Sequence, residues 1–196
     1  MSNTPSASTS DVRVDVQKSD QPASKLSKAF LIDVAVSGLL AFLAIGALSL
    51  LHFGITDQSD HTLILGSFGA SAVLLFGAPS LPFSQPRNCI GGHCLSCFVG
   101  VACYELLDKP NLHSPWLATP VSAALALMGM QLTGTVHPPA GGTVLIAVLG
   151  SNRLHDMGFA LLLPTFIGSV LLVCVAMLNN LIYARKAKAS YPTRWL

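Results

Sequence analysis

The run at 136–143, which reads VHPPAGGT, holds the residue types best suited to binding chemistry. Two consecutive prolines end one helix and set the backbone angle for the first turn of the next. The two glycines leave the backbone open to close approach, and unpaired amides at a new helix start attract anions. A histidine beside them could donate to the anion or change its protonation. The anion-binding residues predicted here are His137, Gly141, Gly142 and Thr143.

Further polar residues lie where the chain is otherwise apolar, and polar groups inside a membrane are candidate functional groups. Ser67 and Ser71 are four residues apart, so on a helix they share one face with Gly69 nearby. Arg87 offers a planar fork of donors suited to an oxyanion, and Asn88 follows it in a turn between two apolar segments. His93 follows two glycines and could face the same cavity. These residues complete the predicted anion site.

A different chemistry is possible for the cysteines. Cys89, His93 and Cys97 are spaced four apart, so on a helix they would form one stripe. Thiolate and imidazole together suit zinc or a soft metal ion. Isolated cysteines in apolar helices usually act as small hydrophobic residues. A soft-metal transporter therefore stays an alternative, and the expected site contains no metal and no cofactor.

The composition indicates a membrane protein. Of the 196 residues, 52% are hydrophobic and 10% are charged, against roughly 25% charged residues in soluble domains, and the mean hydropathy is +0.60. This argues against an ordinary cytosolic enzyme and a nucleic-acid partner. The sequence shows no nucleotide-binding loop, hydrolase triad or paired carboxylates, so we expect that the protein is not an enzyme.

Six apolar segments are expected to form an all-α, polytopic membrane bundle. A full crossing needs about 20 residues, so the first and sixth segments are long enough to span the bilayer and the fifth is too short. The second and fifth are expected to be short or re-entrant, which leaves four or six full spans. The segments are 29–53, 62–78, 90–107, 116–133, 138–150 and 158–183.

The ends of the chain carry most of the charge. Residues 1–28 are polar without an apolar run and predict a flexible tail, 29–183 form the transmembrane domain, and 184–196 form a short basic tail. With six spans and the N-terminus inside, all of the 11 Lys and Arg residues except Lys109 and Arg153 are cytoplasmic. We therefore expect both termini in the cytoplasm, with the bilayer as a partner.

The second and fifth segments resemble each other, GASAVLLF at 69–76 against GGTVLIAV at 141–148. Short segments interrupted by Gly or Pro in corresponding halves point to a transporter binding site. The similarity is compatible with a 3+3 inverted repeat, although small residues at helix starts also serve close helix packing. Faces of small residues make a homo-oligomer plausible.

Several separated motifs resemble one family: GSFGASAVLLFGAP at 66–79, QPRN at 85–88, GGH at 91–93 and TVHPPAGGT at 135–143. Together they resemble the HPP family of integral membrane proteins, over about residues 28–194. The resemblance implies a small membrane transporter of a small inorganic anion, nitrite, as in members from plant plastids and from bacteria or cyanobacteria. We expect this protein in a bacterial inner membrane.

The sequence thus predicts a membrane transporter or channel for a small monovalent anion, and the resemblance implies that this anion is nitrite. The predicted site draws on the second segment, Arg87, and residues 137–143. The alternatives are a soft-metal ion transporter using Cys89, His93 and Cys97, and a membrane scaffold that transports nothing.

Overall fold

The computed structural model describes residues 28–55, 62–109, 114–183 and 191–192, and none of these residues is in a strand. The two predicted tails at 1–28 and 184–196 lie almost wholly outside the described residues. The described chain is an all-α bundle, as predicted. Its helices are α1 (Lys28–Ile55), α2 (Thr62–Gly77), α3 (Pro86–Cys103), α4 (Pro115–Thr133), α5 (Ala140–Leu149), α6 (Asn152–Met157) and α7 (Leu162–Tyr183).

Four stretches of this bundle are long and apolar enough to cross a membrane. They are Phe30–Leu50, Pro86–Asp108, Pro115–Thr133 and Asn152–Leu178. The helical stretches Gly66–Gly77 and Ala140–Leu149 are apolar but shorter. At 1.5 Å per residue, the ten residues of α5 extend about 15 Å, half of the hydrocarbon thickness. The second and fifth segments are thus the short ones, as the sequence predicts.

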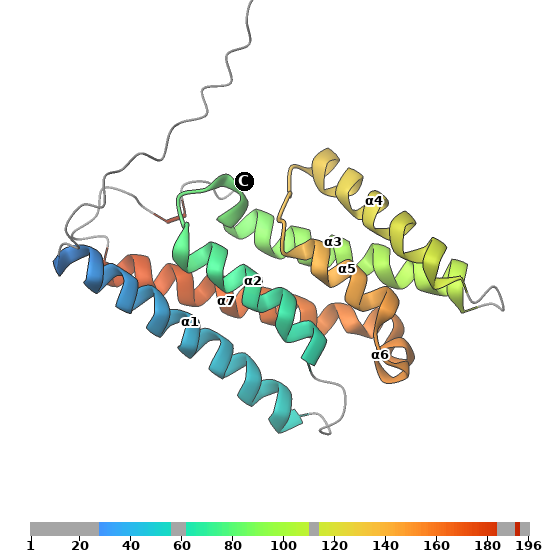
Figure 1. Cartoon of the computed structure of the whole chain (residues 1–196), viewed down its shortest axis with the longest axis horizontal. Helices are drawn as coiled ribbons and strands as arrows, with labels where there is room; N and C mark the ends of the chain where they lie inside the picture. Colours follow the sequence, from blue (N-terminus) through green and yellow to red (C-terminus); the bar gives the residue numbers. More distant parts are fainter. Residues whose placement is uncertain (1–27, 56–61, 110–113, 184–190, 193–196) are drawn as a thin grey trace, which may run out of the picture.

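Apart from the short α6, the helices lie side by side and alternate in direction along the chain (Figure 1). The start of α1 and the end of α7 therefore lie at the same end of the bundle. α2 and α5 run in opposite directions and contact each other, and α3 packs against α4, α5 and α7. The two short helices thus pack against each other and against longer helices, while some of their side chains, such as Val73 on α2 and Leu149 on α5, stay exposed.

The third helix begins earlier than predicted. Its first residue is Pro86, not Ile90, and Gln85 before it has extended backbone angles. Proline favours the first helical position because its missing N–H has no partner there in any case. Arg87 and Asn88 therefore lie in the first turn of α3 rather than in a loop, a start that hydropathy alone obscures.

The outer surface of the bundle is apolar while its interior contains polar groups. Large hydrophobic side chains such as Phe42, Leu50, Trp116 and Leu132 are mostly exposed. The hydrophobic core between α1, α2 and α7 includes Ala44, Phe68 and Leu172. Exposed apolar side chains on this scale are what an integral membrane protein presents to lipid.

Close packing of α3 against α5 depends on glycine. A Cβ atom added at Gly92 would lie 2.7 Å from the His137 Cβ and 2.9 Å from the Thr135 carbonyl oxygen. One added at Gly100 would lie 2.6 Å from the Ala147 Cβ. Small residues let membrane helices approach this closely. The approach brings the turn before α5 against the face of α3 that carries His93.

Candidate functional site

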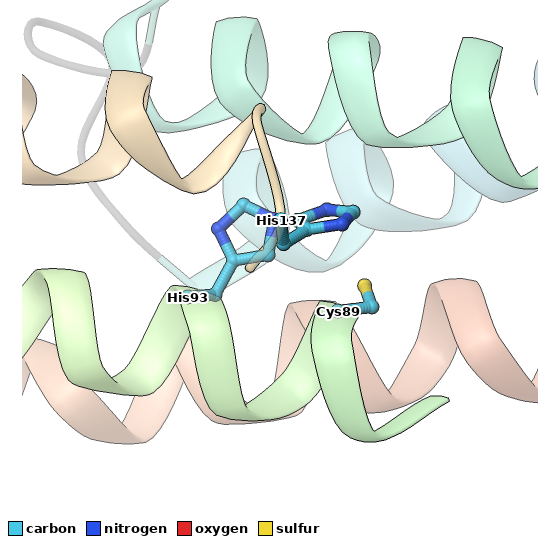
Figure 2. Close-up of side chains that lie close together, drawn as sticks. All are labelled: Cys89, His93 and His137. Carbon is cyan, nitrogen blue, oxygen red and sulfur yellow. The ribbon is translucent and has the colours of Figure 1, made fainter. Parts of the chain in front are cut away.

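A polar network occupies the centre of the bundle, where α2, α3 and the turn before α5 meet. Its side chains are Ser67 and Ser71 from α2, His93 from α3, His137 from the turn, and Thr143 from α5. Ser71, His93 and His137 are fully buried, and Ser67 and Thr143 are 6% exposed. Figure 2 shows the two imidazole rings next to each other, with Cys89 beside them. The structure thus brings together five residues predicted from three separate parts of the sequence.

The Ser71 hydroxyl lies between the two imidazoles. Its oxygen is 2.7 Å from Nε2 of His93 and 2.9 Å from Nε2 of His137. It is also 3.1 Å from the carbonyl oxygen of Ser67, four residues earlier on α2. The ring centroids of the two histidines are 5.0 Å apart. A single hydroxyl therefore couples the two rings.

The outer ring nitrogens have partners of their own. Nδ1 of His93 lies 2.7 Å from Oγ1 of Thr143, which in turn is 3.1 Å from Oγ of Ser67. Nδ1 of His137 lies 2.8 Å from the carbonyl oxygen of Phe83. Because a carbonyl oxygen can only accept, His137 donates through Nδ1–H. All four imidazole nitrogens are hydrogen-bonded.

The surroundings of the network are largely apolar. The Phe68 ring lies 5.0 Å from the His93 ring, between centroids, and helices α2, α4, α5 and α7 contain no Asp, Glu, Lys or Arg. A buried polar group costs free energy unless it is hydrogen-bonded, so this network must stay fully connected to be tolerated. Apolar side chains would fill the space at lower cost, which indicates a function other than packing.

Arg87 and Asn88 do not join the network. The Arg87 guanidinium donates to the carbonyl oxygen of Thr133 at 2.6 Å in an exposed position. The Asn88 side-chain amide donates to the carbonyl oxygen of Val136 at 2.8 Å. Both contacts bind the start of α3 to the segment that leads into His137. In the structure these two residues therefore connect α3 to that segment, and no Arg87 atom lies within 4 Å of a Cβ built at Gly69 or Gly141.

The amides at the start of α5 are not free, contrary to the expectation from the sequence. The N–H groups of Ala140, Gly141 and Gly142 donate to the carbonyl oxygens of His137, Pro138 and Pro139, at 2.9, 3.0 and 2.9 Å. The proline turn continues directly into the helix, so each amide finds a carbonyl three residues back. This helix start is therefore not a site of unpaired amides.

The three predicted glycines have different surroundings. Gly69 lies within α2 rather than at its start, and an added Cβ there or at Gly141 would meet nothing within 4 Å. An added Cβ at Gly142 would lie 3.3 Å from the Ser67 Cβ. Among the three, Gly142 is therefore the one that brings the network's helices α2 and α5 together.

The cysteine stripe is divided by the structure. Cys89, His93 and His137 each offer a ligand atom within 4.8 Å of the others, whereas Cys97 accepts a hydrogen bond from Thr165 Oγ1 at 3.6 Å. Cys97 therefore does not complete a site with Cys89 and His93. A metal ion bound at Cys89, His93 and His137 would have to replace existing imidazole hydrogen bonds. As it stands, the geometry is that of a hydrogen-bonded network.

The Phe83 carbonyl and the residues that hold it were not foreseen. Ser84 and Gln85 are buried, and their side chains donate to carbonyl oxygens of the α2–α3 connection, Ala78 and Pro79 among them. The Tyr191 hydroxyl donates to the Ser84 carbonyl at 2.9 Å, and burial raises the pKa of this phenol. The Ser-Gln-Pro sequence marks a turn, but no sequence pattern reports which backbone carbonyl it presents.

A groove of about 620 Å³ lies beside the network. It is lined by Ala70, Val73, Leu74, Gly77, Ala78, Pro138 and Pro139. The lining is apolar and includes none of the polar side chains of the network. The proline pair thus separates an apolar surface on one side from His137 on the other.

The comparisons agree on one family. Residues 27–192 match the family described as HPP, transmembrane region. Two transmembrane proteins of Dictyostelium discoideum are 37% identical over 168 residues and 34% identical over 163 residues, covering 86% and 83% of this chain but 53% and 56% of their own. The chain thus spans about half the length of these curated relatives. No solved structure matches. The chain belongs to the HPP family of transmembrane proteins.

Proposed function

We propose that this HPP-family membrane protein is a transporter of a small monovalent anion, with nitrite as the candidate substrate. We place the transport centre at Ser71, His93, His137 and Thr143. The observation that carries the proposal is the buried pair of imidazoles joined through one hydroxyl. Intramembrane ionisable residues of this kind mark substrate and proton pathways.

The chemistry of the four side chains supports a small anion. Each of them can donate a hydrogen bond to an anion, and each can return to its present partner when the anion leaves. The helices around the centre supply no carboxylate that would attract a cation. Nitrite is small and accepts hydrogen bonds through its oxygens, and it is the anion that the family resemblance implies. Recognition is therefore assigned to hydroxyls and imidazoles instead of Arg87 and the start of α5.

An acyl-transfer enzyme is the less favoured explanation of the same atoms. A serine hydrogen-bonded to histidine resembles an activated nucleophile with its base. Ser71, however, lies within a membrane-embedded helix at 0% exposure and is shared by two imidazoles. The amides at the start of α5, which could otherwise stabilise an oxyanion, are already engaged. A transport role requires no such donor arrangement.

The proposal is tested by nitrite uptake into liposomes that contain the purified full chain, with protein-free liposomes as the background. We expect uptake above background by the wild type and a loss of at least tenfold in His137→Gln. Glutamine keeps a donor near Phe83 but cannot change protonation. Uptake no greater than background, both for nitrite and for other small anions, would contradict a transport role and favour the scaffold.

The soft-metal alternative is tested in the same vesicles by Cys89→Ser. The anion proposal expects nitrite uptake within about twofold of wild type, because serine preserves the volume and Cys89 has no assigned contact with the anion. Loss of nitrite uptake together with uptake of Cu(I) or Zn²⁺ by the wild type alone would favour a metal transporter.

A further inference from the structure

The hydrogen-bonded chain at the transport centre can be followed atom by atom. It runs from the Phe83 carbonyl through His137, Ser71 and His93 to Thr143, over contacts of 2.8, 2.9, 2.7 and 2.7 Å. Each contact needs one hydrogen, and each hydroxyl has only one to donate. The positions of the hydrogens along the chain therefore follow from counting, once every buried ring nitrogen is required to have a partner.

The count starts at the Phe83 carbonyl, which fixes the His137 hydrogen on Nδ1. Nε2 of a neutral His137 must then accept, and the donor within reach is the Ser71 hydroxyl. The same hydroxyl lies 3.1 Å from the Ser67 carbonyl oxygen, so pairing the buried ring nitrogen takes its one hydrogen away from that carbonyl. Because Ser71 has used its hydrogen, it accepts from Nε2–H of His93. Nδ1 of His93 is left to accept from the Thr143 hydroxyl. The two neutral histidines therefore carry their hydrogens on opposite nitrogens.

From this arrangement we infer that the network is a proton-binding site that takes up one proton and passes it from Thr143 to His137. A proton entering at the Thr143 oxygen lets the existing Thr143 hydrogen move to Nδ1 of His93. His93 then gives its Nε2 hydrogen to Ser71, and Ser71 gives its own to Nε2 of His137. One bond to hydrogen forms as the next one breaks, and a single positive charge ends on His137.

The contact between the Thr143 and Ser67 hydroxyls, which the count for the neutral state does not use, is explained by the protonated state. With five hydrogens in place, His137 donates to Ser71, Ser71 donates to Nε2 of His93, and Nδ1 of His93 donates to Thr143. The Thr143 oxygen then accepts from His93, so its own hydrogen is no longer needed there and can be donated to Oγ of Ser67, which lies 3.1 Å away. Every contact of Thr143 is thus used in one of the two states.

A second proton is opposed by the first, because the rings are only 5.0 Å apart, between centroids, in an apolar setting. Among the described residues, the groups near the rings offer no fixed counter-charge. α3 presents the thiols of Cys89, Cys94 and Cys97, with Arg87 turned to Thr133, and α2, α4, α5 and α7 contain no Asp, Glu, Lys or Arg. The Tyr191 phenol lies beyond Cys89 and donates to Ser84.

A lone positive charge in this interior needs an anion beside it. The substrate class that follows is therefore a monovalent anion together with one proton, so that the loaded centre is neutral. This step rests on the proposed function, whereas the proton site itself rests on the geometry alone.

The proton site is tested by ¹⁵N NMR of histidine side chains in the full chain in lipid. Comparison with His93→Gln and His137→Gln assigns the two rings among the six histidines. At neutral pH we expect His137 to carry hydrogen on Nδ1 and His93 on Nε2. On acidification we expect the pair to take up one proton and His93 to change to Nδ1–H. The same tautomer on both rings, or two independent protonations, would overturn the inference.

A matched pair of serine variants tests the role of the bridge. Ser71→Ala removes the hydroxyl between the rings and should uncouple them, so that each histidine titrates independently. Ser122→Ala removes an equally buried hydroxyl that donates to the Thr119 carbonyl of its own helix, and it should leave the coupled change intact. Coupled titration that persists in Ser71→Ala would rule out the relay.

Transport distinguishes this inference from the proposed function. With a pH-sensitive dye inside the liposomes, one proton should enter with each nitrite, and uptake should increase as the external pH falls. Nitrite entry without a proton would overturn the inference and leave the anion transporter standing. Opposite tautomers and single-proton uptake without nitrite transport would keep the proton site and refute the proposed substrate.

Discussion

At the scale of single residues, the contacts follow from hydrogen-bond capacity more than from charge. Ser67 and Ser71 share a helix face because they are four apart, and this much could be predicted from spacing. The partner of His137 could not, because the Phe83 carbonyl is a backbone group whose direction depends on a turn held by Ser84 and Gln85. Arg87 appeared suited to an anion by residue type alone, yet its nearest acceptor is the Thr133 carbonyl.

Arg87→Gln distinguishes the anion-binding role predicted from the sequence from a role in positioning the start of α3. Arg87 donates at the exposed rim and has no contact with the buried imidazoles, so we expect nitrite uptake to stay within about threefold of the wild type. The loss of one exposed hydrogen bond should cost no more than about 1 kcal/mol of stability. Initial uptake rates at several nitrite concentrations measure the effect, and a large rise in apparent KM would return Arg87 to the binding site.

At the scale of elements, the short helices and their small residues position the centre. The lengths of the second and fifth segments were predictable from hydropathy, and the proline pair correctly marked the start of α5. The start of α3 was not predictable from hydropathy, because Arg87 and Asn88 interrupt the apolar pattern just after Pro86. α6 is a helix of six residues in which polar and apolar residues show no helical period, so the sequence did not predict it.

Gly92→Ala tests the close approach of α3 to the turn before α5. The new methyl group would lie 2.7 Å from the His137 Cβ and 2.9 Å from the Thr135 carbonyl, and neither can rotate away. Overpacking of this kind costs about 1–3 kcal/mol. We expect a lower thermal midpoint in detergent and reduced uptake.

Gly141→Ala is the matched control, since its added methyl group meets nothing within 4 Å and alanine favours a helix. We expect a midpoint equal to or slightly above that of the wild type. Equal destabilisation by the two substitutions would show that glycine at position 92 is not required for packing.

At the scale of the whole molecule, the alternating directions of α1, α2, α3, α4, α5 and α7 bring the start of α1 and the end of α7 to one end of the bundle (Figure 1). The opposite directions of α2 and α5 are compatible with the inverted repeat that the sequence suggests.

The Lys and Arg bias further predicts that both ends face the cytoplasm. Reporter fusions at the two termini check this. We expect fluorescence from a green fluorescent protein and no activity from alkaline phosphatase at either end. Opposite results at the two ends would require an odd number of crossings.

The measurement that tests the central claim most directly is the initial rate of nitrite uptake by liposomes containing Ser71→Ala, compared with Ser122→Ala. Both variants remove a fully buried serine hydroxyl, but only Ser71 joins the two imidazoles. Two lost hydrogen bonds in the apolar interior correspond to about 1–3 kcal/mol. The account predicts at least a tenfold loss for Ser71→Ala and a rate within twofold of wild type for Ser122→Ala. Equal rates in the two variants would contradict a transport centre at this hydroxyl.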